Sequence, residues 1–230
     1  MKISLNYANF NKALDALKKE YEIHAPIEVP SIGNFSDTSV IRYHQIDRVE
    51  DICFDRKSNF SAKEVMLPIT QTMFYFTEDN VKVPEEKNKK YLIFLRSCDL
   101  HSVKRVDEIY LNNKFLDIYY KKVRENVKFV VFGCPNSFEN CFCVDMGTNK
   151  TDDYNIGIKV TDSEIFLDIK DEEFINYFAN DRLNYRKQEF EMEFVEDNEI
   201  HVDIPDNIEL EDVINLDLWR EYDKRCIACG

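Results

Sequence analysis

Two continuous apolar runs constrain the fold more than any other feature of the sequence. The first is YLIFL, Tyr91 to Leu95, and the second is VKFVVFG, which ends at Gly133. Runs of this kind are typical of strands that are buried on both faces of a sheet. We therefore expect two central strands with helices packed against them.

The segment between these runs favours a helix. In CDLHSVKRVDEIYL, the apolar residues recur at the spacing of one helix face. Asp99 is predicted to be the N-cap residue of this helix. A strand, a helix and a strand in this order predict a right-handed crossover between two parallel strands.

The N-terminal segments give weaker patterns. LDALKKEYE has Leu14, Leu17 and Tyr21 on one face and predicts an amphipathic helix, whereas SVIRYHQI predicts a strand. Between them, HAPIEVPSIGNFSDTSV is interrupted by prolines and a glycine and predicts mostly loop. SAKEVMLPITQTMFYFTED predicts a turn followed by a short extended or helical stretch.

The last third of the chain alternates between polar and apolar residues. NIGIKVTDSEIFLDI predicts a β-hairpin, DEEFINYFAND a short helix, and QEFEMEFVEDNEIHVDIP two more strands. DVINLDLWREYDK predicts a helix that leads into the terminal RCIACG. The sequence thus predicts a mixed α/β fold, with a mixed sheet, in one domain over residues 1–215. A linker helix then leads into the start of a second module over residues 216–230.

Composition and cysteine number exclude several classes of protein. The net charge of −14 argues against a nucleic-acid partner, because phosphates require a basic face. No apolar run reaches the roughly 20 residues of a membrane span, and the N-terminus does not resemble a signal peptide. Seven cysteines, an odd number, argue against a disulfide framework. We expect a cytoplasmic protein whose clustered thiols bind metal or do redox chemistry.

Four of the cysteines are expected to meet at one edge of the sheet. Cys98 and Cys134 each follow the carboxyl end of a predicted strand, and that edge is where open α/β sheets commonly bind ligands. The loop after Cys134 is long enough to fold back and bring Cys141 and Cys143 to the same point. Four thiolates are the ligand set of an iron–sulfur cluster or of a structural zinc ion.

The cysteine spacing favours a cluster. Zinc sites are typically built from paired C-x2-4-C motifs, whereas here a lone Cys98 joins C-x6-C-x-C. A cubane iron–sulfur cluster is therefore our leading interpretation. Structural zinc, a catalytic thiol or disulfide pair, and plain burial remain alternatives. Cys53 is predicted to be only a small buried residue.

Residues around these thiols are expected to support a cluster. Backbone N–H groups at the start of the helix after Asp99 are predicted to offset the negative charge of the thiolates. Phe138 and Phe142 are predicted to exclude water, which influences reduction potential. His101 is either a hydrogen-bond partner of a cluster sulfur or an exposed helix residue.

The terminal CIACG is a separate motif. Cys226 and Cys229 form the first half of the bacterial ferredoxin run C-x2-C-x2-C-x3-C-P. We expect them to begin a ferredoxin-like module, as its first two cluster ligands. The chain has no phosphate-binding G-x-G-x-x-G motif and no convincing Ser/His/Asp set, so we expect a relay and no catalytic residues of its own.

The chain resembles the iron–sulfur subunit of anaerobic sulfite reductase, a family akin to the beta subunits of sulfhydrogenases and related nickel–iron hydrogenases. The resemblance rests on SAKEVMLPITQTMFYF, LRSCDLHSVKRVDEIYL, FGCPNSFENCFCVDMGTN, YNIGIKVTD and RCIACG. These segments span most of the chain from Ser61 to Gly230. The combination of CDL, the lone cysteine and CFC followed by MGTN is fairly specific.

The resemblance implies an electron-transfer subunit of a multi-subunit reductase. Such a subunit passes electrons from a flavin- and NAD(P)H-binding partner to a catalytic subunit, which in sulfite reductase contains sirohaem. Members of the family bind 4Fe–4S clusters and continue past CIACG into a domain with two further clusters, whereas this sequence ends there. In the matching motifs, the residues that correspond to cluster ligands are Cys98, Cys134, Cys141 and Cys143, then Cys226 and Cys229.

Overall fold

A computed structural model describes residues 1–33, 37–67, 70–84 and 89–227 of the chain. The strands of the main sheet are β1 (Lys2–Leu5), β2 (Tyr21–Val29), β3 (Val40–Gln45), β6 (Lys90–Arg96), β7 (Val127–Phe132), β8 (Ile156–Val160), β9 (Ile165–Ile169) and β10 (Tyr185–Lys187). A separate hairpin contains β4 (Tyr75–Phe76) and β5 (Val81–Lys82). The α-helices are α1 (Tyr7–Leu17), α2 (Ser97–Tyr110), α3 (Ile118–Arg124), α4 (Ile175–Phe178), α5 (Leu210–Ile214) and α6 (Leu218–Arg225). Short 3-10 helices are η1 (Val49–Asp51), η2 (Ala62–Val65) and η3 (Glu172–Phe174).

Within the described residues, the main sheet has eight strands in the order β10-β1-β9-β8-β7-β6-β2-β3. The neighbouring strands β2, β6, β7 and β8 are parallel, and the outer pairs are antiparallel. The mixed α/β fold predicted from the sequence is therefore confirmed, as are the parallel pairing of β6 with β7 and the β8–β9 hairpin.

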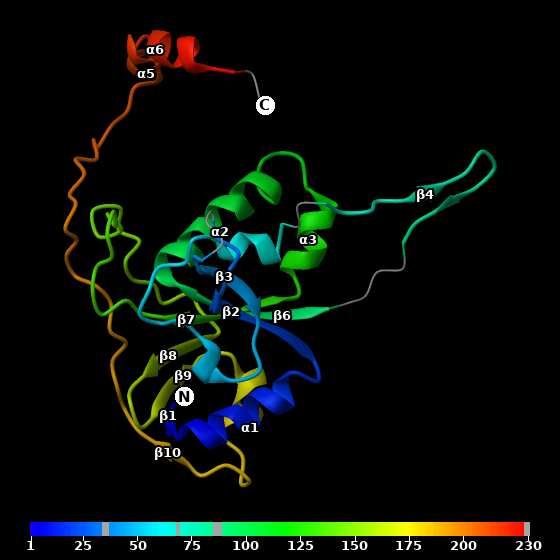
Figure 1. The fold of residues 1–230 in the computed structure, drawn as a ribbon, viewed down its shortest axis with the longest axis vertical. Helices are drawn as coiled ribbons and strands as arrows, with labels where there is room; N and C mark the ends of the chain where they lie inside the picture. Colours follow the sequence, from blue (N-terminus) through cyan, green and yellow to red (C-terminus); the bar gives the residue numbers. More distant parts are fainter. Residues whose placement is uncertain (34–36, 68–69, 85–88, 228–230) are drawn as a thin grey trace.

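Helices cover both faces of the sheet (Figure 1). Alternate residues of β6 explain why, because Leu92 and Phe94 pack on the side of α1 and α4, whereas Ile93 and Leu95 pack on the side of α2 and α3. All four side chains are buried. A strand between two helical layers has no solvent-facing side, which is the physical reason for its continuous apolar sequence.

Several predicted boundaries are wrong. Helix α1 starts earlier than predicted, because the side chain of Asn6 accepts a hydrogen bond from the backbone N–H of Asn9 and caps it. The helix ends at Leu17, so Tyr21 begins β2 instead of lying on the helix face. The segment predicted as mostly loop starts with the second half of β2, which continues through Pro26 to Val29. The predicted C-terminal helix is two short helices, α5 and α6.

The predicted pair of strands near the C-terminus is also wrong. After β10, residues 188–209 form no regular structure. Some of their alternating apolar side chains nevertheless pack against the body, since the ring of Phe190 contacts that of Phe166 in β9 and Val195 is buried. We call residues 193–202 the strap, because this segment lies against the loop that contains the cysteines.

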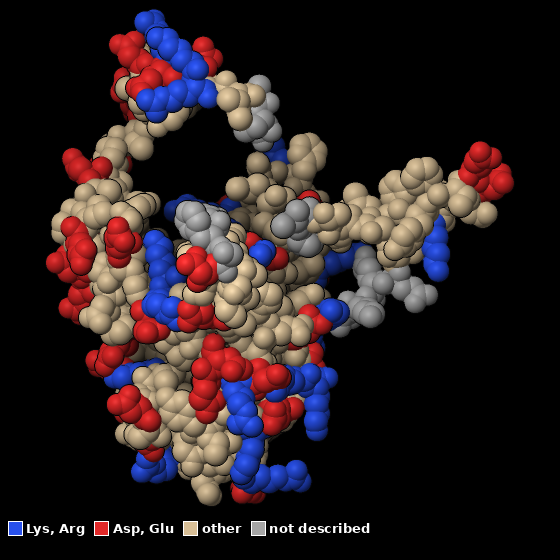
Figure 2. Space-filling model, viewed as in Figure 1, with Lys and Arg blue, Asp and Glu red and all other residues tan. Residues whose placement is uncertain are grey.

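Two parts of the chain stand out from the layered body. The β4–β5 hairpin projects from it, and α5 and α6 lie beyond residues 188–209 with no buried residue (Figure 1). Figure 2 shows the hairpin largely without charge except near its tip, whereas acidic and basic side chains alternate over the body. No helix among the described residues is long and apolar enough to cross a membrane.

Candidate metal centre

The register of β6 and β7 positions Cys98 and Cys134 at the same level. Arg96, the last residue of β6, is the direct partner of Phe132, the last residue of β7. Each cysteine lies two residues beyond its member of this pair, so both thiols emerge at the carboxyl edge of the sheet. Adjacent strands are only about 5 Å apart. The predicted approach of these two cysteines is therefore a consequence of the strand pairing.

The loop between β7 and β8 returns Cys141 and Cys143 to that edge. A turn closes where the N–H of Cys141 donates to the carbonyl of Phe138, with Asn140 in the left-handed conformation. Asparagine tolerates this conformation better than most residues.

A second turn, at MGT, ends the cysteine-containing part of the loop. The N–H of Thr148 donates to the carbonyl of Cys143, and the N–H of Gly147 donates to the carbonyl of Val144. Gly147 has a positive φ of 63°. This is the Schellman pattern, which requires a residue at ease in the left-handed region. The glycine of the MGTN motif therefore terminates the turn that contains Cys143.

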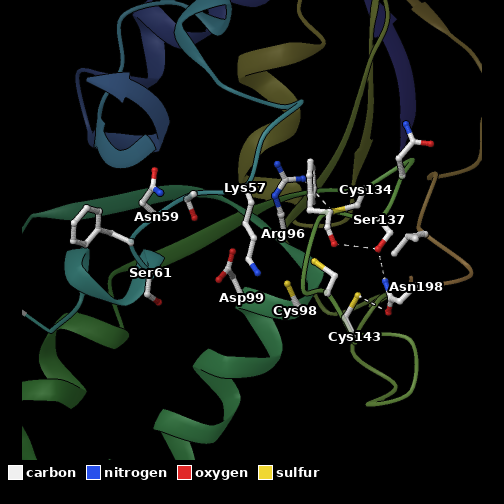
Figure 3. A pocket seen from close by; sticks show the side chains of 16 residues that line it. Lys57, Asn59, Ser61, Arg96, Cys98, Asp99, Cys134, Ser137, Cys143 and Asn198 are labelled. Carbon is white, nitrogen blue, oxygen red and sulfur yellow. Dashed lines mark hydrogen bonds between the residues drawn. The ribbon is translucent and has the colours of Figure 1, made fainter. Parts of the chain in front are cut away.

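The four thiols line one pocket of about 250 Å³. Figure 3 shows Cys98 between Asp99 and Lys57 on one side and Cys143 on the other, at the pocket that all these residues line. Cys98 comes from the first turn of α2, and the other three cysteines from the loop after β7. The structure thus brings together all four cysteines that the sequence singled out, and all four are half-buried and free.

Arg96 contributes a positive charge to this pocket. Its Nη1 donates to Sγ of Cys134 at 3.0 Å, and its guanidinium lies over the rings of Phe132 and Phe138. Arg96 was not predicted from the sequence. The signal was present, because a charged residue at the end of an otherwise continuous apolar strand is unusual.

Asn198 of the strap fixes the cysteine loop. Its Oδ1 accepts from the backbone N–H of Val144 at 2.8 Å and from Sγ of Cys143 at 3.7 Å. Its Nδ2 donates to Oγ of Ser137 at 3.0 Å, and the side chain is 3% exposed. One asparagine therefore holds two parts of the loop at once. It was not predicted from the sequence, because its position was assigned to a solvent-facing turn between two strands.

The strap approaches closely at the start of the loop as well. A Cβ atom on Gly133 would lie 1.6 Å from the backbone carbonyl oxygen of Glu193. Only glycine fits this position without displacing the strap. Asn149 donates to the carbonyl of Val195, and Asp145 accepts from the N–H of Val202. Loop and strap are thus joined along their length.

The electrostatics of the pocket favour the protonated form of the thiols unless a cation offsets the negative charge of the thiolates. Burial raises the pKa of Cys98 to about 12, and the nearby charges of Asp99, Cys134 and Cys143 add to this. Burial also raises the pKa of Cys134, whereas the Arg96 guanidinium opposes that increase. Bringing several thiolates into one half-buried space is costly, so a cationic group is needed to hold them together.

Asp99 is not the N-cap residue that the sequence predicted. Helix α2 begins at Ser97, with Arg96 at the N-cap position, so Asp99 lies inside the first turn. Burial raises the pKa of its carboxyl group, which accepts a hydrogen bond from Tyr43 Oη at 3.3 Å. The helix therefore starts three residues earlier than predicted.

Of the other residues predicted to support the site, one lines the pocket and two do not. Phe138 lines the pocket, as expected. Phe142 is 45% exposed and is not among the lining residues. His101 contacts the backbone carbonyl of Lys150 at 3.0 Å and does not line the pocket either. Cys53 is buried, which confirms its predicted role as a small core residue.

Cys226, the first cysteine of the terminal motif, does not line this pocket. Cys226 is exposed and free, and Cys229 lies outside the described residues. The structure therefore does not test the expected ferredoxin-like module.

The donor set of the pocket fits an iron–sulfur cluster. It supplies four thiol sulfurs, two basic side chains, Lys57 and Arg96, and the ring of Phe138. Among the described residues, no three His, Cys, Asp or Glu side chains are gathered tightly enough to hold a single metal ion.

Comparison with known proteins identifies one informative relative. Sulfhydrogenase 2 subunit beta of Pyrococcus furiosus is 22% identical to this chain over 251 residues. The match covers 99% of this chain and 69% of that protein. No protein-family model matches the chain, and no solved structure matches it. The chain is thus a distant relative of one component of a hydrogenase.

Proposed function

We propose that the chain is an iron–sulfur electron-transfer subunit of a multi-subunit oxidoreductase. The proposal rests on one observation, that Cys98 from the β6–α2 junction and three cysteines from the β7–β8 loop line the same pocket. The relationship, along nearly the whole chain, to a sulfhydrogenase beta subunit supports it.

In this proposal the ligands are Cys98, Cys134, Cys141 and Cys143. A 4Fe–4S cluster, when bound, accepts and releases single electrons. The chain supplies the thiolates, a buried cation and a partly apolar enclosure. Cys226 and Cys229 are proposed to serve a second, ferredoxin-like site.

The resemblance and the comparison indicate two branches of one kind of complex. In the sulfite reductase branch, electrons come from a partner that binds flavin and NAD(P)H, and they go to a catalytic partner that contains sirohaem. In the sulfhydrogenase branch, the electrons go to a hydrogenase partner, and the relative found by comparison belongs to this branch by name. We propose a cytoplasmic complex in either case. Co-purification from the native cell, followed by tests for sirohaem and for nickel, distinguishes the branches.

Anaerobic purification of the chain tests the cluster itself. We expect several iron atoms and acid-labile sulfides per chain and an absorption band that bleaches with dithionite. One zinc ion per colourless chain would instead establish a zinc-stabilised interaction module.

Cysteine variants test whether the site is shared. Cys98→Ser and Cys134→Ser are each expected to lose the iron of the pocket, although the two residues lie on separate segments. Cys53→Ser is the matched control, because Cys53 is buried but does not line the pocket. It should retain iron. Full iron content in either ligand variant would contradict the shared site.

A further inference from the structure

Arg96 is a buried cation in an apolar part of the fold. Its side chain is at the end of β6, and the residue is only 6% exposed. Removing a guanidinium from water costs several kcal/mol unless its donors are satisfied. The contacts of the guanidinium therefore indicate the role of its charge.

Backbone carbonyls and aromatic rings hold the guanidinium in place. Nη2 donates to the carbonyl oxygens of Phe54 at 3.0 Å and Arg56 at 2.8 Å. The rings of Phe132 and Phe138 lie 4.8 and 4.7 Å from its central carbon. These contacts orient the planar group but neutralise none of its charge, because carbonyls and rings are uncharged.

The opposite side of the guanidinium faces sulfur. Nη1 donates to Sγ of Cys134 at 3.0 Å (Figure 3). An arginine keeps its positive charge throughout the physiological pH range. The pocket therefore has a fixed cation and a fixed hydrogen-bond donor beside one of its four thiols, whatever the pH.

We propose that Arg96 is a positioning residue that raises the reduction potential of the cluster bound by the four cysteines. This inference rests on the proposed function. Reduction adds one negative charge to the cluster and its thiolates. A cation and an N–H donor beside Sγ of Cys134 stabilise that added charge more than they stabilise the oxidised state. Hydrogen bonds to ligand sulfur and local charge are known determinants of cluster potential.

A purely structural role makes a different prediction. If Arg96 only anchored residues 54–56 to the sheet, its replacement would lower stability but leave the potential of any assembled cluster unchanged. The reduction potential therefore separates the two roles. Stability and activity do not.

The test is a dithionite titration of anaerobically purified protein, in which the reductant supplies one electron per cluster. We expect Arg96→Gln to shift the midpoint potential negative by about 59 mV or more, a tenfold change in the equilibrium constant for a one-electron couple. Arg96→Lys retains the charge and is expected to restore part of this shift. Iron content is measured in parallel.

Arg124→Gln is the matched control. Arg124 also lies over a phenylalanine of β7, with its central carbon 5.0 Å from the ring of Phe129, but it pairs with Asp107. It does not line the cysteine pocket. We expect its loss to leave the potential unchanged. An equal shift in this variant would show a general effect of surface charge and overturn the inference.

A measurement on the wild-type protein tests the inference even if the Arg96 variants do not fold or do not bind a cluster. Protein grown with arginine labelled with ¹⁵N in the guanidinium group is reduced and studied by pulsed electron paramagnetic resonance. We expect ¹⁵N coupling to the reduced cluster from a donor bonded to a ligand sulfur. No coupling, or an unchanged potential in an iron-loaded Arg96→Gln protein, would overturn the role of Arg96 alone. A wild-type protein without iron would overturn the proposed function as well.

Discussion

The basic residues at the two ends of the parallel strands β6 and β7 have different kinds of partner. At the amino ends, Lys90 lies 3.3 Å from Glu173, and Lys128 lies 2.7 Å from Asp171. At the carboxyl ends, Arg96 meets a thiol, two carbonyls and two rings. The lysines are half-exposed and paired with carboxylates, whereas the arginine is buried and directed at sulfur.

The difference is between lysine charges that are paired with carboxylates and an arginine charge that is directed at the cysteine pocket. A half-exposed ion pair contributes modestly to stability, and its two charges largely cancel. The carbonyls and rings around Arg96 fix its orientation without cancelling its charge. The guanidinium also interacts with the buried carboxyl group of Asp99, and both side chains line the pocket that contains the four cysteines.

The largest expected effect comes from removing an aromatic wall at the carboxyl end. Phe132 is 2% exposed, lies under Arg96 and packs edge-on against Phe54 at 5.2 Å. Phe132→Ala should lower the free energy of unfolding by about 3–5 kcal/mol, because it leaves a cavity in the core. Lys128→Met, on the same strand, should cost about 1 kcal/mol or less. Urea unfolding followed by circular dichroism measures both, and equal losses would remove the contrast between the two ends.

A smaller effect is expected from releasing the loop. Asn198→Ala removes the acceptor of the Val144 N–H and the donor to Ser137. We expect a loss of about 1–3 kcal/mol and faster hydrogen exchange at the amide of Val144. Asn215→Ala, at the C-cap of the exposed helix α5, is the control and should change neither. Unchanged exchange at Val144 would show that the strap does not hold the loop.

The smallest effect concerns pH at the amino end. The hydrogen bond from Tyr21, with support from Lys90, lowers the pKa of Glu173 below its usual value of 4.5. A depressed carboxylate pKa stabilises the fold above the unfolded-state value and loses this contribution as pH falls through the folded-state value. Glu173→Gln should therefore cost under about 1 kcal/mol near pH 7 and nothing in strong acid. Thermal unfolding of both proteins across this range measures the difference, and a gap that widened toward acid would contradict the assignment.

The sequence predicted the centre of the sheet well but not its periphery. Strands β6 and β7 are recognisable because burial on both faces demands continuous apolar residues. Strand β2 was missed because it contains Pro26. Only Tyr21–His24 of β2 pair with β6, and Pro26 lies beyond them. At Pro26 the strand is therefore paired on one side only, with β3. A missing N–H is tolerated at such a position.

The sequence predicted which four cysteines line the candidate site, but not the residues that support them. Cysteines are rare enough for their spacing to be informative, and strand pairing then determines which of them meet. Arg96 and Asn198 act through tertiary contacts with residues far away in the sequence. The alternating side chains around Asn198 predicted a strand, but they pack against the sheet without joining its hydrogen-bond ladder. A pattern of burial alone does not distinguish these two outcomes.

The register of β6 against β7 also sets the order of events when the protein is made. Cys98 emerges from the ribosome well before Cys134, and the two thiols become neighbours only after Arg96 has paired with Phe132. A nascent chain that ended before β7 would contain Cys98 alone of the four pocket cysteines. Under the proposed function, a cluster held by all four cysteines assembles only after this strand pair forms, and cluster content at successive chain lengths would time the closure of the central sheet.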